Sequence, residues 1–342
     1  MHYTVHQDPS IDAVIDQHMQ TIRTRLLSRF GWRIHAIILV GGFGRGEGSI
    51  RQQDESIAPL NDYDLAIIVN TPRSRRLPLE DLAKELADTL SIRFVDLAAV
   101  WRFKLTRTPA SMFAFDMRHA AHVIYGPKHV CSRMPDYSPG SVSIFEGINQ
   151  IANRLIAPTE LVTPAEWQQS QASDVRTVLQ LGKLVTAIGD ALVIQAGRYT
   201  SHYADRATRW NASVLDGHML APFRDFVFQA YQYKLRPETV PSDLDLRAYL
   251  RRTVALLATA MTALGGNPAS QNTDAIDIDG YLACRLSNAW RPPAPRTLSQ
   301  PYLALEREAL QMLQTWAKAD VLTSEMTDHR DALLRRWLEG HH

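Results

Sequence analysis

Two aspartates, Asp62 and Asp64, open an apolar segment that continues to Val69 and is expected to form a strand. Side chains alternate along a strand, so both carboxylates are expected on one side and Tyr63 on the other. Adjacent carboxylates are costly unless a cation lies between them. Mg²⁺ is the natural candidate because it prefers oxygen ligands and often bridges carboxylates to phosphates. The pair therefore predicts a divalent metal site, although such a pair alone is most often a solvated strand end.

A glycine-rich stretch precedes the aspartates and follows an expected strand at residues 35–40. It contains Gly41, Gly42, Gly44 and Gly46, whose backbone N–H groups are suited to approach phosphates. Alone, such a stretch usually forms a tight turn. Together with the aspartate pair it predicts metal-dependent nucleotidyl transfer. Other phosphate-binding motifs do not match this chain. It has no G-x-x-x-x-G-K-[ST], and the glycine stretch lacks the third glycine of a dinucleotide-binding fingerprint.

The order of strand, glycine pair, loop and Asp-x-Asp resembles the DNA polymerase β-like nucleotidyltransferase superfamily over roughly the first third of the chain. Gly41-Gly42 match the glycine pair, Asp62-Tyr63-Asp64 match the Asp-x-Asp, and Asp96 is the best match to a third carboxylate. The resemblance implies two Mg²⁺ ions bound by these three aspartates and an NTP donor, with ATP the first choice. It also implies attack of a hydroxyl on the α-phosphate and release of pyrophosphate.

Two features depart from that pattern. The segment from Gly42 to Asp62 is longer than in compact members, and residues 50–59 are expected to form a polar, solvated insertion. Gly42 also stands where many members have serine. Ser49 is therefore either a phosphate ligand or part of the loop structure.

Further polar residues each have alternative interpretations. Arg45 either clamps phosphate, offsetting charge on the bridging oxygen, or is a surface arginine. Glu47 is expected to pair with Arg45, orient the loop or bind metal. Lys183, on an expected helix, either reaches the nucleotide phosphates or is an exposed lysine. Asp96 is either a metal ligand and proton acceptor or a carboxylate that caps a turn.

A cluster of arginines, Arg73, Arg75 and Arg76, follows the Asp-x-Asp strand. A solvated loop is the first interpretation, and binding of triphosphate or of a phosphorylated acceptor is the alternative.

The net charge of the whole chain is +1, from 37 basic and 36 acidic residues. This balance argues against a large nucleic-acid-binding surface but is compatible with a local basic patch.

The 342 residues suffice for two domains, and 45% hydrophobic with 21% charged residues is typical of folded soluble proteins. Cys131 and Cys284 form no zinc or disulfide signature. The N-terminus lacks a signal-peptide pattern, and the chain has no uninterrupted apolar run of membrane-spanning length. A cytoplasmic protein without a membrane segment is expected.

The expected fold class is α+β, with a small mixed-sheet nucleotidyltransferase core at residues 1–136 and an all-helical domain at 141–342. Apolar periodicity predicts core helices at 10–30 and 79–90 and strands at 35–40, 63–69, 92–97 and 119–125. It predicts later helices at 142–156, 164–196, 218–233, 244–264, 301–319 and 324–339.

A small molecule or sugar-type hydroxyl compound is the expected acceptor. Transfer to a protein, modification of tRNA and a non-catalytic nucleotide-binding regulator are the alternatives, and the helical domain would bind acceptor or partner. A further alternative is that the chain is a helical interaction scaffold in which the Asp-x-Asp has no functional role.

Overall fold

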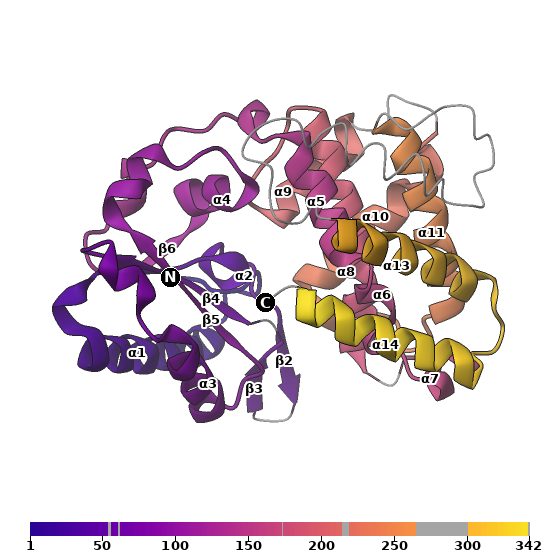
Figure 1. The fold of residues 1–342 in the computed structure, drawn as a ribbon, viewed down its shortest axis with the longest axis horizontal. Coiled ribbons are helices and arrows are strands. Elements are labelled where there is room, and N and C mark those ends of the chain that lie inside the picture. Colours follow the sequence, from indigo (N-terminus) through magenta and orange to yellow (C-terminus); the bar gives the residue numbers. More distant parts are fainter. Residues whose placement is uncertain (54–55, 61, 173, 214–218, 265–299, 341–342) are drawn as a thin grey trace. The chain divides into compact units, whose positions relative to one another are not determined.

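The computed structural model describes residues 1–342 except 54–55, 61, 173, 214–218, 265–299 and 341–342 (Figure 1). The chain divides into two compact units. The first contains Met1–Val142, Thr200–Asp205 and Leu235–Pro237, and the second contains Ser143–Tyr199, Arg206–Lys234 and Glu238–His342. A small mixed sheet lies in the first unit and helices follow it, which confirms the α+β class at that level.

The main sheet has four strands in the order β5-β4-β1-β6. Their bounds are Ile34–Leu39 for β1, Tyr63–Val69 for β4, Val95–Trp101 for β5 and His122–Tyr125 for β6. Strand β1 is antiparallel to β4 and β6, whereas β4 and β5 are parallel. The expected strand at 92–97 starts too early, because the Ile92 N–H bonds the Ala87 carbonyl at 3.0 Å and completes the end of the preceding helix.

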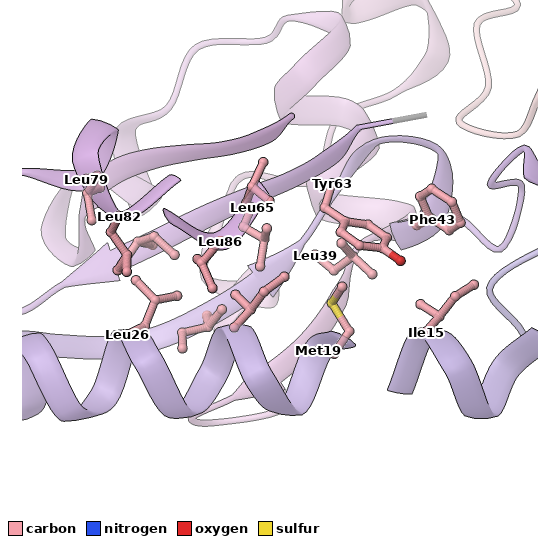
Figure 2. Close-up of a cluster of buried hydrophobic side chains, with 14 of the residues drawn as sticks. Ile15, Met19, Leu26, Leu39, Phe43, Tyr63, Leu65, Leu79, Leu82 and Leu86 are labelled. Carbon is pink, nitrogen blue, oxygen red and sulfur yellow. The ribbon is translucent and has the colours of Figure 1, made fainter. Parts of the chain in front are cut away.

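Helices α1 (Pro9–Phe30) and α3 (Leu79–Leu90) contribute apolar side chains to one core with the strands, as Figure 2 shows. Asp8 caps α1, because the Asp8 carboxylate accepts the Ser10 N–H at 2.8 Å. Gly31 ends the helix with a φ of 47° and follows the glycine rule for helix ends. This core buries the Tyr63 side of β4 and leaves the Asp64 side facing the other way.

Two segments of the first unit differ from the sequence expectation. The expected strand at 119–125 begins later, at His122, because the residues up to Ala120 belong to helix α4 (Met112–Ala120), which the Ser111 hydroxyl caps by accepting the Ala114 N–H at 3.0 Å. The expected polar insertion contains paired strands β2 (Ile50–Gln53) and β3 (Ser56–Pro59). Ile50 is buried, so this segment has an anchor in the core.

Short helices make up much of the remaining first unit. They are α2 (Gly41–Gly44), η1 (Gly31–Arg33), η2 (Arg73–Arg76), η3 (Arg102–Arg107), η4 (Val130–Arg133) and η5 (Pro139–Ser141). Cys131 in η4 is a buried free thiol, and Cys284 lies outside the described residues. The η2 helix replaces the loop expected around the three arginines.

Among the described residues of the second unit, the regular elements are helices and no strand is present. They are α5 (Ile144–Arg154), α6 (Ala157–Glu160), α7 (Pro164–Gln169), α8 (Val175–Gln195), η6 (Ala221–Phe223), α10 (Arg224–Leu235), η7 (Pro237–Thr239), α11 (Leu246–Ala263), α13 (Gln300–Lys318) and α14 (Ser324–Gly340). Helix α9 (Tyr203–Ser213), which the sequence pattern did not predict, begins in the first unit. The expected helix at 164–196 is two helices, because Ser170 takes a left-handed conformation with φ 56°.

Helix α8 is the apolar centre of the second unit. By length and composition it is able to cross a membrane, yet 83% of the apolar window is buried within the structure. The core helix of a soluble protein passes the same test. Helix α5 packs closely on it, since a Cβ on Gly147 would come within 2.6 Å of the Ala191 Cα.

Candidate functional site

Asp64 and Asp96 are direct partners in the parallel pair formed by β4 and β5. Adjacent strands lie about 4.8 Å apart, and paired residues project to the same face of a sheet. The preceding pair, Tyr63 and Val95, is buried in the core on the opposite face. The two carboxylates therefore project side by side from neighbouring strands.

Asp62 stands one residue before β4 and is exposed, while Asp64 is partly buried. Tyr63 between them is fully buried, which confirms the predicted alternation of this segment. Its hydroxyl lies 2.8 Å from Nδ1 of His18 on α1. Burial raises the pKa of Tyr63 and lowers the pKa of His18, because it disfavours the charged form of both groups.

Gly41 lies directly against the Asp64 carboxylate. It has a φ of 65°, and a Cβ at this position would come within 2.0 Å of the Asp64 Oδ2. The Val40 N–H donates to the Asp64 carbonyl at 2.9 Å and holds the end of β1 beside the start of β4. The glycine turn and the aspartates, predicted to form one site, are brought together at this point.

Two of the other glycines in this stretch, Gly42 and Gly44, have different surroundings. A Cβ on Gly42 would have the Glu47 carbonyl oxygen as its nearest neighbour at 3.4 Å, so this position is only moderately crowded. Gly44 is buried, and a Cβ there would meet the Leu39 carbonyl oxygen at 2.4 Å. Gly44 is needed for the packing of α2 against β1, whereas Gly41, Gly42 and Gly46 are partly exposed.

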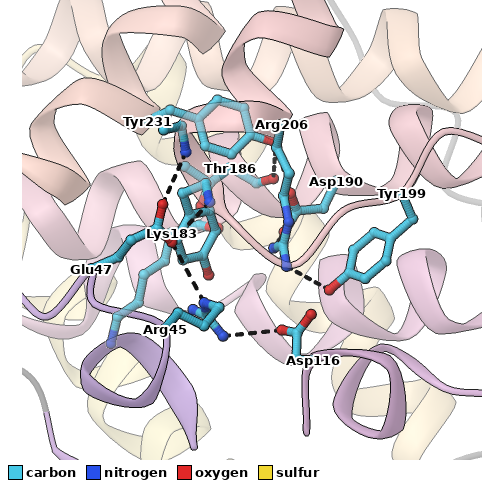
Figure 3. A network of polar contacts seen from close by, with 11 residues as sticks. Arg45, Glu47, Asp116, Lys183, Thr186, Asp190, Tyr199, Arg206 and Tyr231 are labelled. Atoms are coloured by element: carbon cyan, nitrogen blue, oxygen red, sulfur yellow. Dashed lines mark hydrogen bonds and ion pairs between the residues drawn. The ribbon is translucent and has the colours of Figure 1, made fainter. Parts of the chain in front are cut away.

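Arg45 is a buried ion-pair partner, which corrects its interpretation as a surface arginine, while its contact with phosphate stays a prediction. Its side chain is 8% exposed and donates to Asp116 at 3.0 Å, as Figure 3 shows. A second carboxylate, that of Glu47, lies 3.5 Å from its Nε, and its guanidinium lies 4.9 Å from the Tyr203 ring centroid. With two carboxylates beside it, the charge of Arg45 is already balanced within the protein, so a phosphate clamp is disfavoured.

Glu47 connects the glycine turn to the first residues of α9. Its two carboxylate oxygens accept the backbone N–H groups of Tyr203 and Ala204 at 2.9 and 3.1 Å. A carboxylate at a helix N-terminus satisfies donors that have no partner within the helix and complements its dipole. The predicted pairing of Glu47 with Arg45 is confirmed, and the contacts indicate a structural role for Glu47.

Three further predicted positions have the following surroundings. Ser49 is 1% exposed, and its carbonyl accepts the Leu60 N–H at 2.9 Å, so it belongs to the interior of the first unit. Lys183 is on α8 in the second unit and is partly buried. Helix η2 with its arginines begins beyond Val69, and the stretch from Asp64 to Val69 alone spans about 17 Å of strand.

The donor types suit magnesium, but the expected three-carboxylate cluster is not assembled. Among the described residues, no group of three or more His, Cys, Asp or Glu side chains is gathered to hold a metal ion. Mg²⁺ is usually bound by one or two carboxylates completed by phosphate oxygens and water. The neighbouring Asp64 and Asp96 match these donor types, and the absence of a side chain on Gly41 gives the Asp64 carboxylate its space.

Asp116 and His18 are the polar residues near this arrangement that the sequence reasoning missed. Asp116 is 71 positions from Arg45, and His18 is 45 positions from Tyr63. Ser111 before an apolar run was an available signal for the helix that carries Asp116. No local pattern identifies the His18 contact.

Comparison with known proteins gave no match: no protein-family model, no curated protein and no solved structure is similar to this chain.

Proposed function

We propose that the chain is a Mg²⁺-dependent nucleotidyltransferase of the DNA polymerase β-like type. It transfers an NMP from an NTP, ATP being the first choice, to a hydroxyl of a small-molecule or sugar-type acceptor and releases pyrophosphate. The observation that carries the proposal is the placement of Asp64 beside Asp96 on parallel strands, with the backbone of Gly41 against the Asp64 carboxylate.

In the proposed reaction, the acceptor oxygen forms a bond to the α-phosphorus while the bond to the bridging oxygen of the leaving pyrophosphate breaks. Asp62 and Asp64 are the proposed metal ligands, and bound Mg²⁺ would neutralise phosphate charge. Asp96, the strand partner of Asp64, would bind a second ion or accept the proton of the attacking hydroxyl. The backbone at Gly41 and Gly42 would approach the triphosphate.

The buried ion pairs have a positioning role in this proposal. Arg45 and Glu47 fix the end of the glycine turn through Asp116 and through the first N–H groups of α9. Catalysis of phosphoryl transfer depends mainly on positioning and electrostatic stabilisation. A rigid turn beside Asp64 is what such chemistry requires. The phosphate contact of Lys183 stays a prediction.

Calorimetric titration with a non-hydrolysable ATP or GTP analogue in the presence of Mg²⁺ tests the proposal. We expect binding that requires the metal, is lost in the Asp62→Asn/Asp64→Asn variant and persists in Asp88→Asn, a control at an exposed position on α3. Absence of NTP binding by the folded protein would overturn the proposal. Turnover of labelled NTP, with loss in Asp96→Asn, distinguishes a transferase from a nucleotide-binding regulator.

A further inference from the structure

The end of the sheet opposite Asp64 and Asp96 brings three basic segments together. Residues 31–33 lead into β1, and residues 70–78 follow β4. Residues 101–108 consist of the last residue of β5, helix η3 and the residue after it. The register pairs Ile34 with Val69 and Val69 with Trp101, so all three segments meet at one end of the sheet.

Asn70 joins the three segments through hydrogen bonds. Its backbone N–H donates to the Arg33 carbonyl at 2.9 Å, and its side-chain Nδ2 donates to the Trp32 carbonyl at 2.5 Å. Its Oδ1 accepts a hydrogen bond from Arg102 at 3.3 Å. The segments are therefore held in one arrangement rather than being independent loops.

Positive charge is concentrated in these segments. They contain no Asp or Glu, and they carry Arg33, Arg73, Arg75, Arg76, Arg102, Lys104 and Arg107. All of these except the partly buried Arg102 are exposed, and we call the six exposed cations the basic end of the sheet. Within the described part of the chain, none of the six forms an ion pair. The acidic residues nearest in sequence to the 70–78 segment are Glu80 and Asp81, and Glu80 pairs with Lys84 at 2.9 Å.

Two exposed aromatic side chains lie among the cations. Trp32 is 74% exposed and Phe103 is 50% exposed. The Arg102 guanidinium lies 4.7 Å from the Phe103 ring centroid, and Trp101 makes an edge contact with the same ring at 5.5 Å. Phe103 is thus supported by neighbouring side chains, while a large part of its surface is open to solvent.

The positive field of this region acts on a neighbouring histidine. His35, the second residue of β1, has a pKa below its ordinary value because of burial and, in addition, because of the charges of Arg102 and Arg133. Arg133, in η4, is exposed as well. Cations from a fourth segment therefore add to the field at this end of the sheet.

We propose that the basic end of the sheet, with Trp32 and Phe103, binds single-stranded nucleic acid. Such a strand alternates phosphates, which pair with arginine and lysine, with bases, which stack on exposed aromatic rings. A membrane surface is the less suitable partner, because stable insertion requires a continuous apolar face and the two exposed rings here are surrounded by charge. The net charge of the whole chain conceals this surface, because the positive charge is local.

Fluorescence anisotropy with a labelled 15-nucleotide polyuridine RNA, without NTP or Mg²⁺, tests the proposal. Binding is expected to weaken with salt, with a slope of log K against log[salt] of about −2 to −4 if three to six phosphates are contacted. The Arg75→Glu/Arg76→Glu variant should bind about tenfold or more weakly and show a shallower slope. Trp32→Ala should weaken binding roughly tenfold without changing the slope.

The matched control is Lys318→Glu/Arg335→Glu, which makes the same charge change at exposed positions of the second unit. It should bind like the unaltered protein. Equal losses in both charge-reversed variants, no effect of Trp32→Ala, or binding to phosphatidylserine vesicles without binding to RNA would overturn the proposal. Because Asp64→Asn should leave RNA binding intact, failure here and failure of the proposed transferase activity are distinguishable.

Discussion

The Asp64 carboxylate occupies the space that a side chain on Gly41 would need, with its Oδ2 within 2.0 Å of the position of a Cβ. Gly41→Ala must therefore displace Asp64 as well as strain a backbone with φ 65°. We expect Mg²⁺-dependent NTP binding to fall at least tenfold and the free energy of unfolding to drop by about 1–3 kcal/mol. Calorimetry and urea unfolding measure the two effects.

Gly31→Ala is the control for this change. Gly31 also has a positive φ, 47°, but nothing lies within 4 Å of a Cβ there. Its substitution should destabilise the protein without changing NTP affinity once the protein is folded. Equal loss of NTP affinity in both variants would show that the close approach of Gly41 to Asp64 has no specific role.

The Arg45–Asp116 pair should contribute to stability rather than to phosphate binding. Asp116→Ala leaves a guanidinium in a site where its side chain is 8% exposed, and removal of one partner of such a pair costs about 3 kcal/mol. Urea unfolding should show this loss. The control is Glu80→Ala, which breaks the exposed pair with Lys84 and should have little effect. If Asp116→Ala instead kept full stability and changed only NTP affinity, Arg45 would be a phosphate ligand after all.

Elements with strong local patterns were predictable from the sequence. The strand at 63–69 and the helix at 79–90 have the bounds expected from their periodicity. The alternation that buries Tyr63 followed from strand geometry alone. These features depend on residues that are close together in the chain.

Features that depend on distant residues were missed. Arg45 was interpreted as a phosphate ligand or a surface residue because its partner Asp116 lies 71 positions away, in a helix that the sequence pattern did not predict. The strand carrying Asp96 starts later than its apolar pattern, since hydrogen bonds at the end of α3 use the residues before it. The basic end of the sheet was seen only as the arginines of one segment, because three separate segments build it.

The stability of the first unit should fall in mild acid because of His18. Burial holds its pKa below the ordinary 6.5, so between these two values the unfolded chain binds more protons than the folded chain. The stabilisation is complete above about pH 6.5 and decreases as the pH falls below that value. Unfolding midpoints from pH 5 to 8 should show this slope, and His18→Gln should reduce it. The exposed His129→Gln is the control, and an unchanged slope in His18→Gln would refute the assignment.

A buried polar network in the second unit should contribute strongly to its stability. The Arg206 side chain is 1% exposed and donates hydrogen bonds to Asp190 at 2.9 Å and to the Tyr199 hydroxyl at 2.5 Å (Figure 3). The Tyr231 hydroxyl also donates to Asp190, at 2.7 Å. Asp190→Ala leaves a buried guanidinium without its carboxylate and should cost about 3–5 kcal/mol in urea unfolding. Tyr231→Phe removes one hydrogen bond and should cost about 1–2 kcal/mol. A matched exposed change, Asp328→Ala, should stay within about 0.5 kcal/mol. Similar small losses in all three variants would mean that the network is replaceable by packing alone.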